Sequence, residues 1–407
     1  MPRNAFGYRN FRLFQTARFI LTIAIQMQAI AVGWHIYELT HSALHLGFVG
    51  LVQFLPAIIL ALITGHTADR FDRQKILVCT MSGISVCCTM LAALTQFANA
   101  SLPAMYFVLC ILGTIRAFTG PASHALLPQL VPPERFGNAL ALGSSTWQIA
   151  TVLGPSLGGL IYGSAGGALT VYIIAAVLAC GAALLMTRVN PEPVPLETRA
   201  ISWETVFAGI RYIWSEKIIL GAMSLDLFAV LLGGSVALLP IYASDILHVG
   251  PYGLGILRSA PAAGAAVMAI ILAAYPIVNH AGLKMFAGVA TFGMCTLVFG
   301  LSKNFGLSLA ALFVLGAADM ISVVVRGLLV QGATPSAMRG RVSAVSLVFI
   351  SASNELGEFE SGLTASWFGT VPAVVIGGAG TLIVVAIWLV LFTNLRNANN
   401  IGHMRVN

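Results

Sequence analysis

Charged residues are scarce in this chain of 407 residues, where Asp, Glu, Lys and Arg together make up only 9%. Hydrophobic residues make up 58%, and the mean hydropathy is +0.90. A soluble domain usually has about 25% charged residues. The composition therefore excludes an ordinary soluble protein and predicts a membrane protein in contact with the lipid bilayer.

Lysine is rarer still, with four in the whole chain, and no Gly-x-x-x-x-Gly-Lys-Ser/Thr loop is present to hold nucleotide phosphates. We therefore expect a protein that does not hydrolyse ATP, is not an enzyme and needs no cofactor. The six cysteines all fall inside apolar segments, which favours small buried hydrophobic residues over disulfides or metal ligands. His41 and His45 are too few to predict a metal site.

Long apolar segments are abundant, and each is sufficient to cross a hydrocarbon core with about 20 residues. The sequence predicts twelve such helices, near residues 13–37, 44–65, 76–97, 102–126, 136–162, 166–187, 218–243, 251–277, 283–302, 306–330, 341–368 and 371–392. The predicted fold class is therefore an all-α membrane protein.

Small residues and prolines repeat at fixed offsets along the chain. Gly113, Pro132, Gly137, Gly154 and Gly159 recur 203 residues later as Gly316, Pro335, Gly340, Gly357 and Gly362, and Tyr37, Gly50, Pro56 and Ala57 recur 205 residues later as Tyr242, Gly255, Pro261 and Ala262. This pattern indicates a head-to-tail duplication of a unit of roughly 200 residues, an architecture typical of transporters. We expect an N-terminal six-helix bundle over 1–188, a cytoplasmic linker with an amphipathic helix over 189–217, and a C-terminal six-helix bundle over 218–407.

Lys and Arg residues predict the orientation, because basic loops stay on the cytoplasmic side. Of the 21 basic residues, 16 lie in the N-terminal arm, the even-to-odd loops, the linker and the C-terminal tail, whereas only Lys303 lies in a loop on the other side. Both termini are expected in the cytoplasm. The net charge of +7 then reflects this topology rather than binding of nucleic acid.

The loop after the second predicted helix reads Gly65-His-Thr-Ala-Asp69-Arg70-Phe-Asp72-Arg73-Gln-Lys75. It resembles the signature loop of the major facilitator superfamily, although Asp72 stands where that family often has Gly. The resemblance implies two pseudo-symmetric six-helix bundles, a monomer, and a substrate path lined by helices one, four, seven and ten. It also implies that Gly65, Asp69, Arg70 and Arg73 act in conformational change.

Two further motifs resemble those of proton-driven exporters in the same superfamily. Arg116 with Gly120 resembles the Arg motif of the fourth helix, and Gly154-Pro155-Ser-Leu-Gly158-Gly159 resembles the antiporter motif of the fifth, with Ala150 in place of its usual leading Gly. Pro permits a bend in a helix and Gly permits close approach of a neighbour. A merely structural kink is the alternative. The whole chain resembles the branch that contains the enterobactin exporter and macrolide efflux proteins.

Charges inside the predicted helices each demand a reason, because one charge at the bilayer centre costs roughly 3 kcal/mol or more. They fall mainly on helices one, four, seven, eight, ten and eleven, as Arg18, Arg116, Asp226, Arg258, Asp319, Arg326, Glu355, Glu358 and Glu360. Helix one offers Gln26 and Gln28 where many drug-proton antiporters have a mid-membrane acid. The proton site is therefore expected in the second half.

Burial favours the neutral form of a carboxyl group, so at least one acid should take up and release a proton. Glu355 and Asp226 are the first choices, and Asp319 and Glu358 are further candidates. Arg18, Gln26, Arg116, Arg258, Arg326 and Asn354 are candidates for the substrate path or a gate. Arg116 and Asp319 are repeat partners that could close a gate or form a permanent ion pair, and Asp319 could instead be neutralised by Arg326. Hydrogen bonds at helix ends, or pairing with Arg258, are structural alternatives for the acids.

These features together predict a secondary transporter that exports a small organic molecule, siderophore-like or drug-like, across the inner membrane by proton antiport. Export of a divalent cation by the acids of helices seven, ten and eleven is a second hypothesis, which the intervening Arg residues disfavour. A non-transporting scaffold or a lipid-handling membrane protein is the alternative from another class.

Overall fold

The computed structural model describes residues 4–60, 63–64, 67, 70–97, 101–164, 166–191, 210–277 and 279–398. Its long helices are α1 (Arg9–Thr40), α2 (Ala43–Ile59), α4 (Arg73–Phe97), α5 (Leu102–Leu126), α6 (Phe136–Ser164), α7 (Ala168–Met186), α9 (Lys217–Leu232), α11 (Gly250–Ala274), α12 (Ala281–Leu301), α13 (Phe305–Ala333), α14 (Ser336–Phe368) and α15 (Thr370–Leu391). Each lies where the sequence predicts a helix. Within the described ranges, nine helical segments are long and apolar enough to span a membrane. The predicted all-helical membrane fold is confirmed.

The seventh predicted helix is interrupted. We expected one helix over 218–243, but α9 ends at Leu232 and is followed by Gly233 and Gly234. A 3₁₀ turn, η4 (Ser235–Leu238), a short α10 (Leu239–Ile241) and a π-helical turn, η5 (Tyr242–Ile246), then continue the segment. Two adjacent glycines favour such a break, because they carry no side chain to stabilise the helix.

The chain forms two compact units. Unit 1 contains Met1–Leu39, Val52–Ile201 and Gly250–Ser259, and unit 2 contains Thr40–Leu51, Ser202–Val249 and Ala260–Asn407. The first part of α2 therefore belongs with unit 2, and the first part of α11 belongs with unit 1. Of the expected linker, residues 189–191 and 210–217 are described. Residues 210–215 are helical, and Ile213 is buried against unit 2 residues such as Val342.

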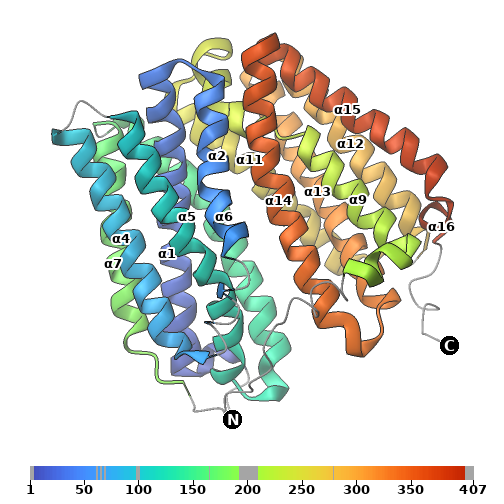
Figure 1. The fold of residues 1–407 in the computed structure, drawn as a ribbon, viewed down its shortest axis with the longest axis horizontal. Helices are drawn as coiled ribbons and strands as arrows, with labels where there is room; N and C mark the ends of the chain where they lie inside the picture. The colour runs from blue at the N-terminus through green and yellow to red at the C-terminus, as the bar shows by residue number, and fades with distance from the viewer. Residues whose placement is uncertain are drawn as a thin grey trace. The chain divides into compact units, whose positions relative to one another are not determined.

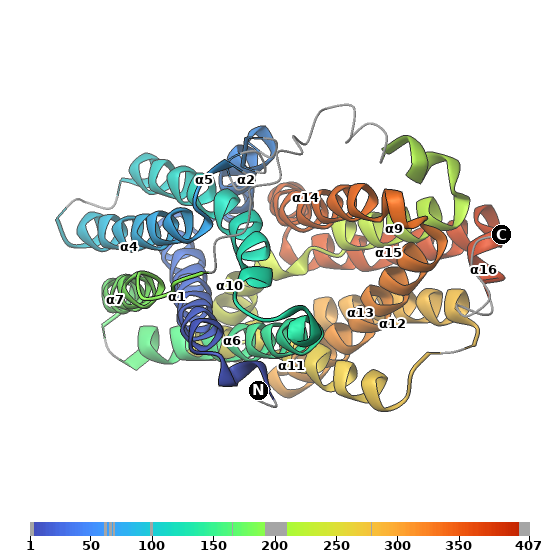
Figure 2. The same ribbon diagram turned by 90° about the horizontal axis from the view of Figure 1, so that it is seen from below.

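Equivalent helices pack in equivalent pairs within the two units. In unit 1, α4 lies beside α7 and α5, and in unit 2 α12 lies beside α15 and α13 (Figures 1 and 2). The sequence offset of about 203–205 carries α4, α5 and α7 onto α12, α13 and α15. The packing thus repeats with the sequence.

Small residues allow these helices to approach closely. A Cβ atom added to Gly113 on α5 would meet the backbone of Gln53 on α2, and one added to its repeat partner Gly316 on α13 would meet the backbone of Pro261 on α11. Helix association in lipid depends on such van der Waals contact, because burial of apolar surface offers little there. The repeated glycines therefore serve the same packing in both units.

The polar turn before α4 is held by Asp72. The Oδ1 atom of Asp72 accepts hydrogen bonds from the backbone N–H groups of Gln74 (3.0 Å) and Lys75 (3.3 Å). Asp is among the preferred residues for capping a helix N-terminus in this way. The Gln74 side chain in turn donates to the carbonyls of Met186 and Thr187, at the end of α7.

Candidate functional site

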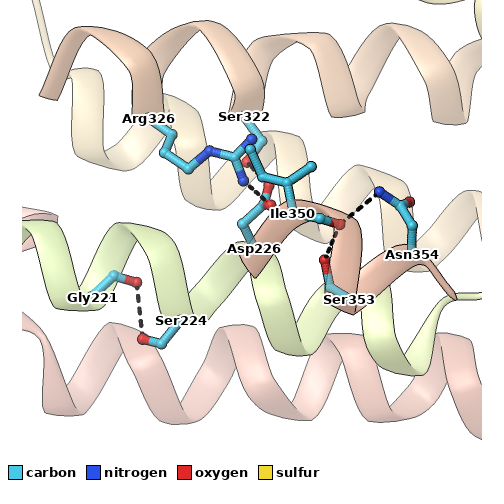
Figure 3. A network of polar contacts seen from close by, with 8 residues as sticks. All are labelled: Gly221, Ser224, Asp226, Ser322, Arg326, Ile350, Ser353 and Asn354. Atoms are coloured by element: carbon cyan, nitrogen blue, oxygen red, sulfur yellow. Dashed lines mark hydrogen bonds and ion pairs between the residues drawn. The ribbon is translucent and has the colours of Figure 1, made fainter. Parts of the chain in front are cut away.

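A buried ion pair joins α9 to α13 in unit 2 (Figure 3). The Arg326 guanidinium donates from Nη1 to Asp226 Oδ2, and the Ser322 hydroxyl donates to Asp226 Oδ1 at 3.2 Å. The Asp226 and Arg326 side chains are only 7% and 8% exposed. Arg326 thus neutralises Asp226, on another helix, rather than Asp319 on its own. Asp226 is one of the two first-choice proton carriers, and in this structure Arg326 compensates its charge.

A small void lies beside this pair, too tight to hold a water molecule, and is bounded mainly by α9 and α14. Its other lining residues are Met223, Leu227, Ser346, Phe349, Ile350 and Ser353. On α14 nearby, Ser353 and Asn354 both donate to the Ile350 carbonyl, at 3.0 and 2.9 Å (Figure 3). The side-chain amide of Asn354, a candidate for the substrate path, therefore donates a hydrogen bond within its own helix.

Asp319 differs from Asp226 in its surroundings. It lies at the midpoint of α13, fourteen residues from Phe305 and fourteen from Ala333. No residue within the described ranges donates a hydrogen bond to its carboxyl group or forms an ion pair with it. Asp319 is therefore an acid in the middle of a membrane-spanning helix without a compensating partner among those residues.

The three acids of α14 have different neighbours. Glu358 reaches toward the start of α2, where its Oε2 lies 3.1 Å from the point that a Cβ atom of Gly50 would occupy. The Glu355 carbonyl lies 3.2 Å from the same point, and both Glu355 and Glu358 make further polar or electrostatic contacts. Glu360 accepts a hydrogen bond from Thr364 at 2.7 Å. The acids of this helix thus do not share one environment.

Three basic residues of the predicted path, Arg18, Arg116 and Arg258, lie in unit 1. Arg18 is half-buried on α1 and packs over the Phe14 ring, 5.4 Å from its centre. Arg116 on α5 donates to the Gln53 side chain at 3.1 Å. Arg258 is half-buried on the part of α11 that belongs to unit 1.

The glycines of the predicted antiporter motif on α6 face two neighbours. A Cβ atom on Gly154 would lie 2.5 Å from Gln26 Cβ, and one on Gly158 would lie 2.9 Å from Met27 Cα, both on α1. Gly159 faces the start of α11, with Gly255 Cα 2.8 Å from its Cβ position. Pro155 lies inside α6 among them. The motif therefore places α6 in close backbone contact with α1 and with the first part of α11.

The signature loop is described only in part. Gly65 and Asp69 lie outside the described residues, whereas Arg70 is exposed and Arg73 begins α4. Asp72, the departure from the family pattern, caps α4 as described above.

Two polar groups were missed by sequence reasoning. Gln15 is buried beside Gly143, and its only signal was its place one turn before Arg18 on α1. Glu38, at the last turn of α1, accepts hydrogen bonds from Trp34 (2.5 Å) and from Tyr162 on α6 (2.6 Å). Its signal was an acid four residues after a tryptophan, a spacing that places both on one helix face.

Duplicated helical units with charged groups inside apolar helices are the architecture of a multi-pass membrane transporter. The chain belongs to the Major Facilitator Superfamily, whose family model matches residues 16–357. This confirms the resemblance inferred from the sequence motifs.

Curated relatives match almost the whole chain. It is 25% identical over 391 residues to the enterobactin exporter EntS of Citrobacter koseri and 24% identical over 391 residues to EntS of Shigella boydii, in each case across 95% of this chain and 92% of the relative.

Solved structures share the fold. The nucleoside transporter NupG matches with a TM-score of 0.70 at 16% identity, covering 94% of this chain and 99% of NupG. A bacterial homolog of the human lysosomal transporter Spinster, inward-facing and occupied, matches with a TM-score of 0.72 at 14% identity, covering 96% of each chain.

Proposed function

We propose that this protein exports a small organic molecule across the inner membrane by proton antiport, through alternating access. Its similarity to enterobactin exporters over 95% of its length supports export of a siderophore-like or drug-like molecule. In this proposal the protein works as a monomer with both termini in the cytoplasm. Two six-helix bundles, 1–188 and 218–407, move relative to each other, joined by the linker 189–217.

Asp319 carries the proposal of proton coupling. The carboxyl group sits at the midpoint of α13, and no described residue offers it a hydrogen bond or a positive charge at ion-pair distance. An isolated carboxylate is costly in a medium of low dielectric, so the group favours its protonated form when lipid or protein surrounds it. When water reaches it, the charged form becomes accessible. A change of access therefore changes its protonation, which is what coupling requires.

Asp226 takes a different part in this mechanism. Arg326 compensates its charge in a place where both side chains are less than one-tenth exposed. A proton entering this pair would leave a buried guanidinium without a counter-charge, which opposes protonation. We therefore assign the ion pair to holding α9 on α13, and proton carriage to Asp319, with Glu355 and Glu358 as further candidates.

The remaining motif residues are assigned to conformational change. Gly154, Pro155, Gly158 and Gly159 keep α6 in close contact with neighbouring backbones. The resemblance to the superfamily's signature loop implies that Gly65, Asp69, Arg70 and Arg73 help to latch the two halves together. Gln26 and Arg116 remain candidates for the path or a gate.

Proton coupling is tested with purified full-length protein in liposomes that contain a pH-sensitive dye. Enterobactin, erythromycin and ethidium serve as probes under an imposed proton gradient. We expect one probe to trigger proton movement, and Asp319→Asn to reduce that movement at least tenfold because an amide cannot carry a proton. Glu360→Gln is the matched control, since it makes the same acid-to-amide change on another helix of unit 2 and should leave proton movement unchanged.

Two results would contradict the proposal. Full proton movement in Asp319→Asn would exclude this residue as the carrier and direct attention to Glu355 or Glu358. If the natural protein instead transports the probe at the same rate with and without a proton gradient, the protein is a facilitator.

A further inference from the structure

Two polar groups of α1 converge on a glycine of α6 in unit 1. A Cβ atom added to Gly143 would lie 3.7 Å from Arg18 Nη1 and 3.7 Å from Gln15 Oε1. Because glycine has no Cβ atom, this point has room for a methyl-sized group, bordered by one cationic donor and one amide acceptor at ordinary contact distance. Arg18 and Gln15 lie on α1 and Gly143 lies on α6, and the functional atoms of both α1 side chains face the same spot.

Gln15 has an unmet hydrogen-bond acceptor. The residue is only 2% exposed, and its Nε2 atom donates to the Gly143 carbonyl at 3.5 Å. Its Oε1 atom is buried, and no donor within the described residues reaches it. Buried side-chain acceptors nearly always have a donor, so the atom points to a partner that binds from outside the chain.

Arg18 has an unmet charge at the same place. It lies nine residues after the start of α1, which corresponds to a depth of about 14 Å along the helix. Its guanidinium packs over Phe14 and forms no hydrogen bond or ion pair with a described residue, whereas Arg326 in unit 2 is fully paired. Among the described residues, His124 on the last turn of α5 lies within electrostatic reach of Arg18, and it supplies no negative charge.

We propose that Arg18, Gln15 and the unfilled Cβ position of Gly143 form a subsite for an organic anion that also carries a hydroxyl or N–H donor. The inference rests on the proposed export of a small organic molecule and names the class of that molecule. The guanidinium donates to the anionic oxygen, which charge-assisted hydrogen bonds favour. Gln15 Oε1 accepts the neighbouring O–H or N–H.

This arrangement also predicts discrimination. A molecule without the negative charge leaves Arg18 uncompensated in a membrane-spanning helix, which is unfavourable. A molecule without the hydroxyl or N–H donor leaves Gln15 Oε1 unsatisfied, and a site with an unpaired buried polar group disfavours such an analogue. The negative charge of the ligand and its hydrogen-bond donor are therefore recognised by different residues.

Binding to the full-length protein in lipid nanodiscs, without any proton gradient, tests the subsite. Calorimetry compares 3-hydroxybenzoate with benzoate, which lacks the hydroxyl group, and with 3-hydroxybenzamide, which lacks the charge. We expect 3-hydroxybenzoate to bind at least tenfold more tightly than 3-hydroxybenzamide. It should bind about threefold more tightly than benzoate, a modest factor because a small ligand makes few contacts.

Variants assign these preferences to residues. Arg18→Gln should weaken 3-hydroxybenzoate binding at least tenfold, with Arg18→Lys intermediate, because lysine keeps the charge but not the planar fork. Gln15→Leu should remove the preference for 3-hydroxybenzoate over benzoate. Gly143→Ala should weaken both acids, because its methyl group fits at ordinary contact distance and fills the open point.

Arg12→Gln is the matched control, since Arg12 lies on the same helix but is exposed, and binding should not change. Thermal unfolding of each variant confirms that it is folded. Equal binding of 3-hydroxybenzoate and 3-hydroxybenzamide, or unchanged binding in Arg18→Gln, would overturn the proposal. Binding of chloride at the site, with no preference among the aromatic probes, would overturn it as well. Because no gradient is present, intact binding with lost proton coupling would contradict antiport alone.

Discussion

Unit 1 and unit 2 share their helix pairings but treat buried charge differently. In unit 2, the acid Asp226 is matched by Arg326, and a second acid, Asp319, stands in the middle of α13. In unit 1, Arg18 lies on α1 with no described acid to match it, and Arg116 is held by the neutral Gln53. Duplication has thus kept the packing of the two units while their charges have diverged.

The clearest instance is a single repeat position. Arg116 on α5 and Asp319 on α13 are 203 residues apart, so the same place in the fold carries a cation in unit 1 and an acid in unit 2. The nearby glycines, Gly113 and Gly316, are unchanged because both face a neighbouring backbone. A position in close backbone contact tolerates few residue types. The charge at a polar position, in contrast, can change from positive to negative and take on a new function.

The largest expected effect comes from breaking the charge balance of unit 2. Arg326→Leu leaves the Asp226 carboxylate buried without its partner, which costs about 3–5 kcal/mol in soluble proteins. We expect a marked drop in the thermal unfolding temperature, measured by tryptophan fluorescence in detergent.

A double variant separates charge from packing at this pair. Asp226→Leu with Arg326→Leu removes both charges and should recover most of the stability lost by Arg326→Leu, because apolar residues often replace a buried ion pair at little cost. A double variant as unstable as the single one would show that the pair acts through its shape instead.

A smaller effect should appear equally in both units when a conserved packing position is filled. Gly113→Ala and Gly316→Ala each place a methyl group against a neighbouring backbone, and such overpacking typically costs about 1–3 kcal/mol. The unfolding temperature measures the effect.

Each of these glycines has a matched control on its own helix. Gly120 on α5 and Gly327 on α13 have open space where a Cβ atom would be, so Gly120→Ala and Gly327→Ala should be neutral or slightly stabilising. A similar loss in all four variants would argue that the glycines act through backbone conformation rather than through close packing.

The smallest expected effect concerns how equivalent helices begin. Asp72 caps α4 in unit 1, whereas α12 in unit 2 begins after His280, which has a φ of 56° and makes no capping bond through its side chain. Asp72→Ala should cost about 1 kcal/mol, a typical loss for a cap. Differential scanning fluorimetry can detect it.

Lys75→Ala is the control for this cap. It removes the exposed ion pair between Lys75 and Asp72, 3.9 Å long, while it leaves the backbone cap in place. Exposed pairs contribute little, so the variant should behave like the natural protein. Equal losses in both variants would mean that the ion pair, not the cap, holds the turn.

Much of the fold was predictable from the sequence, because lipid imposes a simple rule on it. Every spanning backbone must satisfy its own hydrogen bonds, so long apolar runs become helices and the polar turns between them set the boundaries. The break at Gly233 and Gly234 was not predicted, although the glycine pair was its visible signal. Asp72 looked like a departure from the family loop, and its capping bonds supply a physical reason for it.

The candidate site was less predictable, since its chemistry depends on which charges meet. Sequence spacing offered Arg326 as one alternative partner for Asp319, seven residues earlier on the same helix. The structure places Arg326 against Asp226, 100 residues earlier in the chain. Spacing along one helix defines a shared face but says nothing of which neighbouring helix that face meets.

The sequence by itself determined that this protein is a membrane transporter made of duplicated helical units, because hydropathy and repeated glycines are local properties of the chain. Only the tertiary structure decided which buried charges are compensated. It paired Asp226 with Arg326, left Asp319 without a described partner, and brought Arg18 and Gln15 to one face of Gly143. The physical reason is that the energy of a buried charge depends on the few atoms around it, and those atoms come from distant segments.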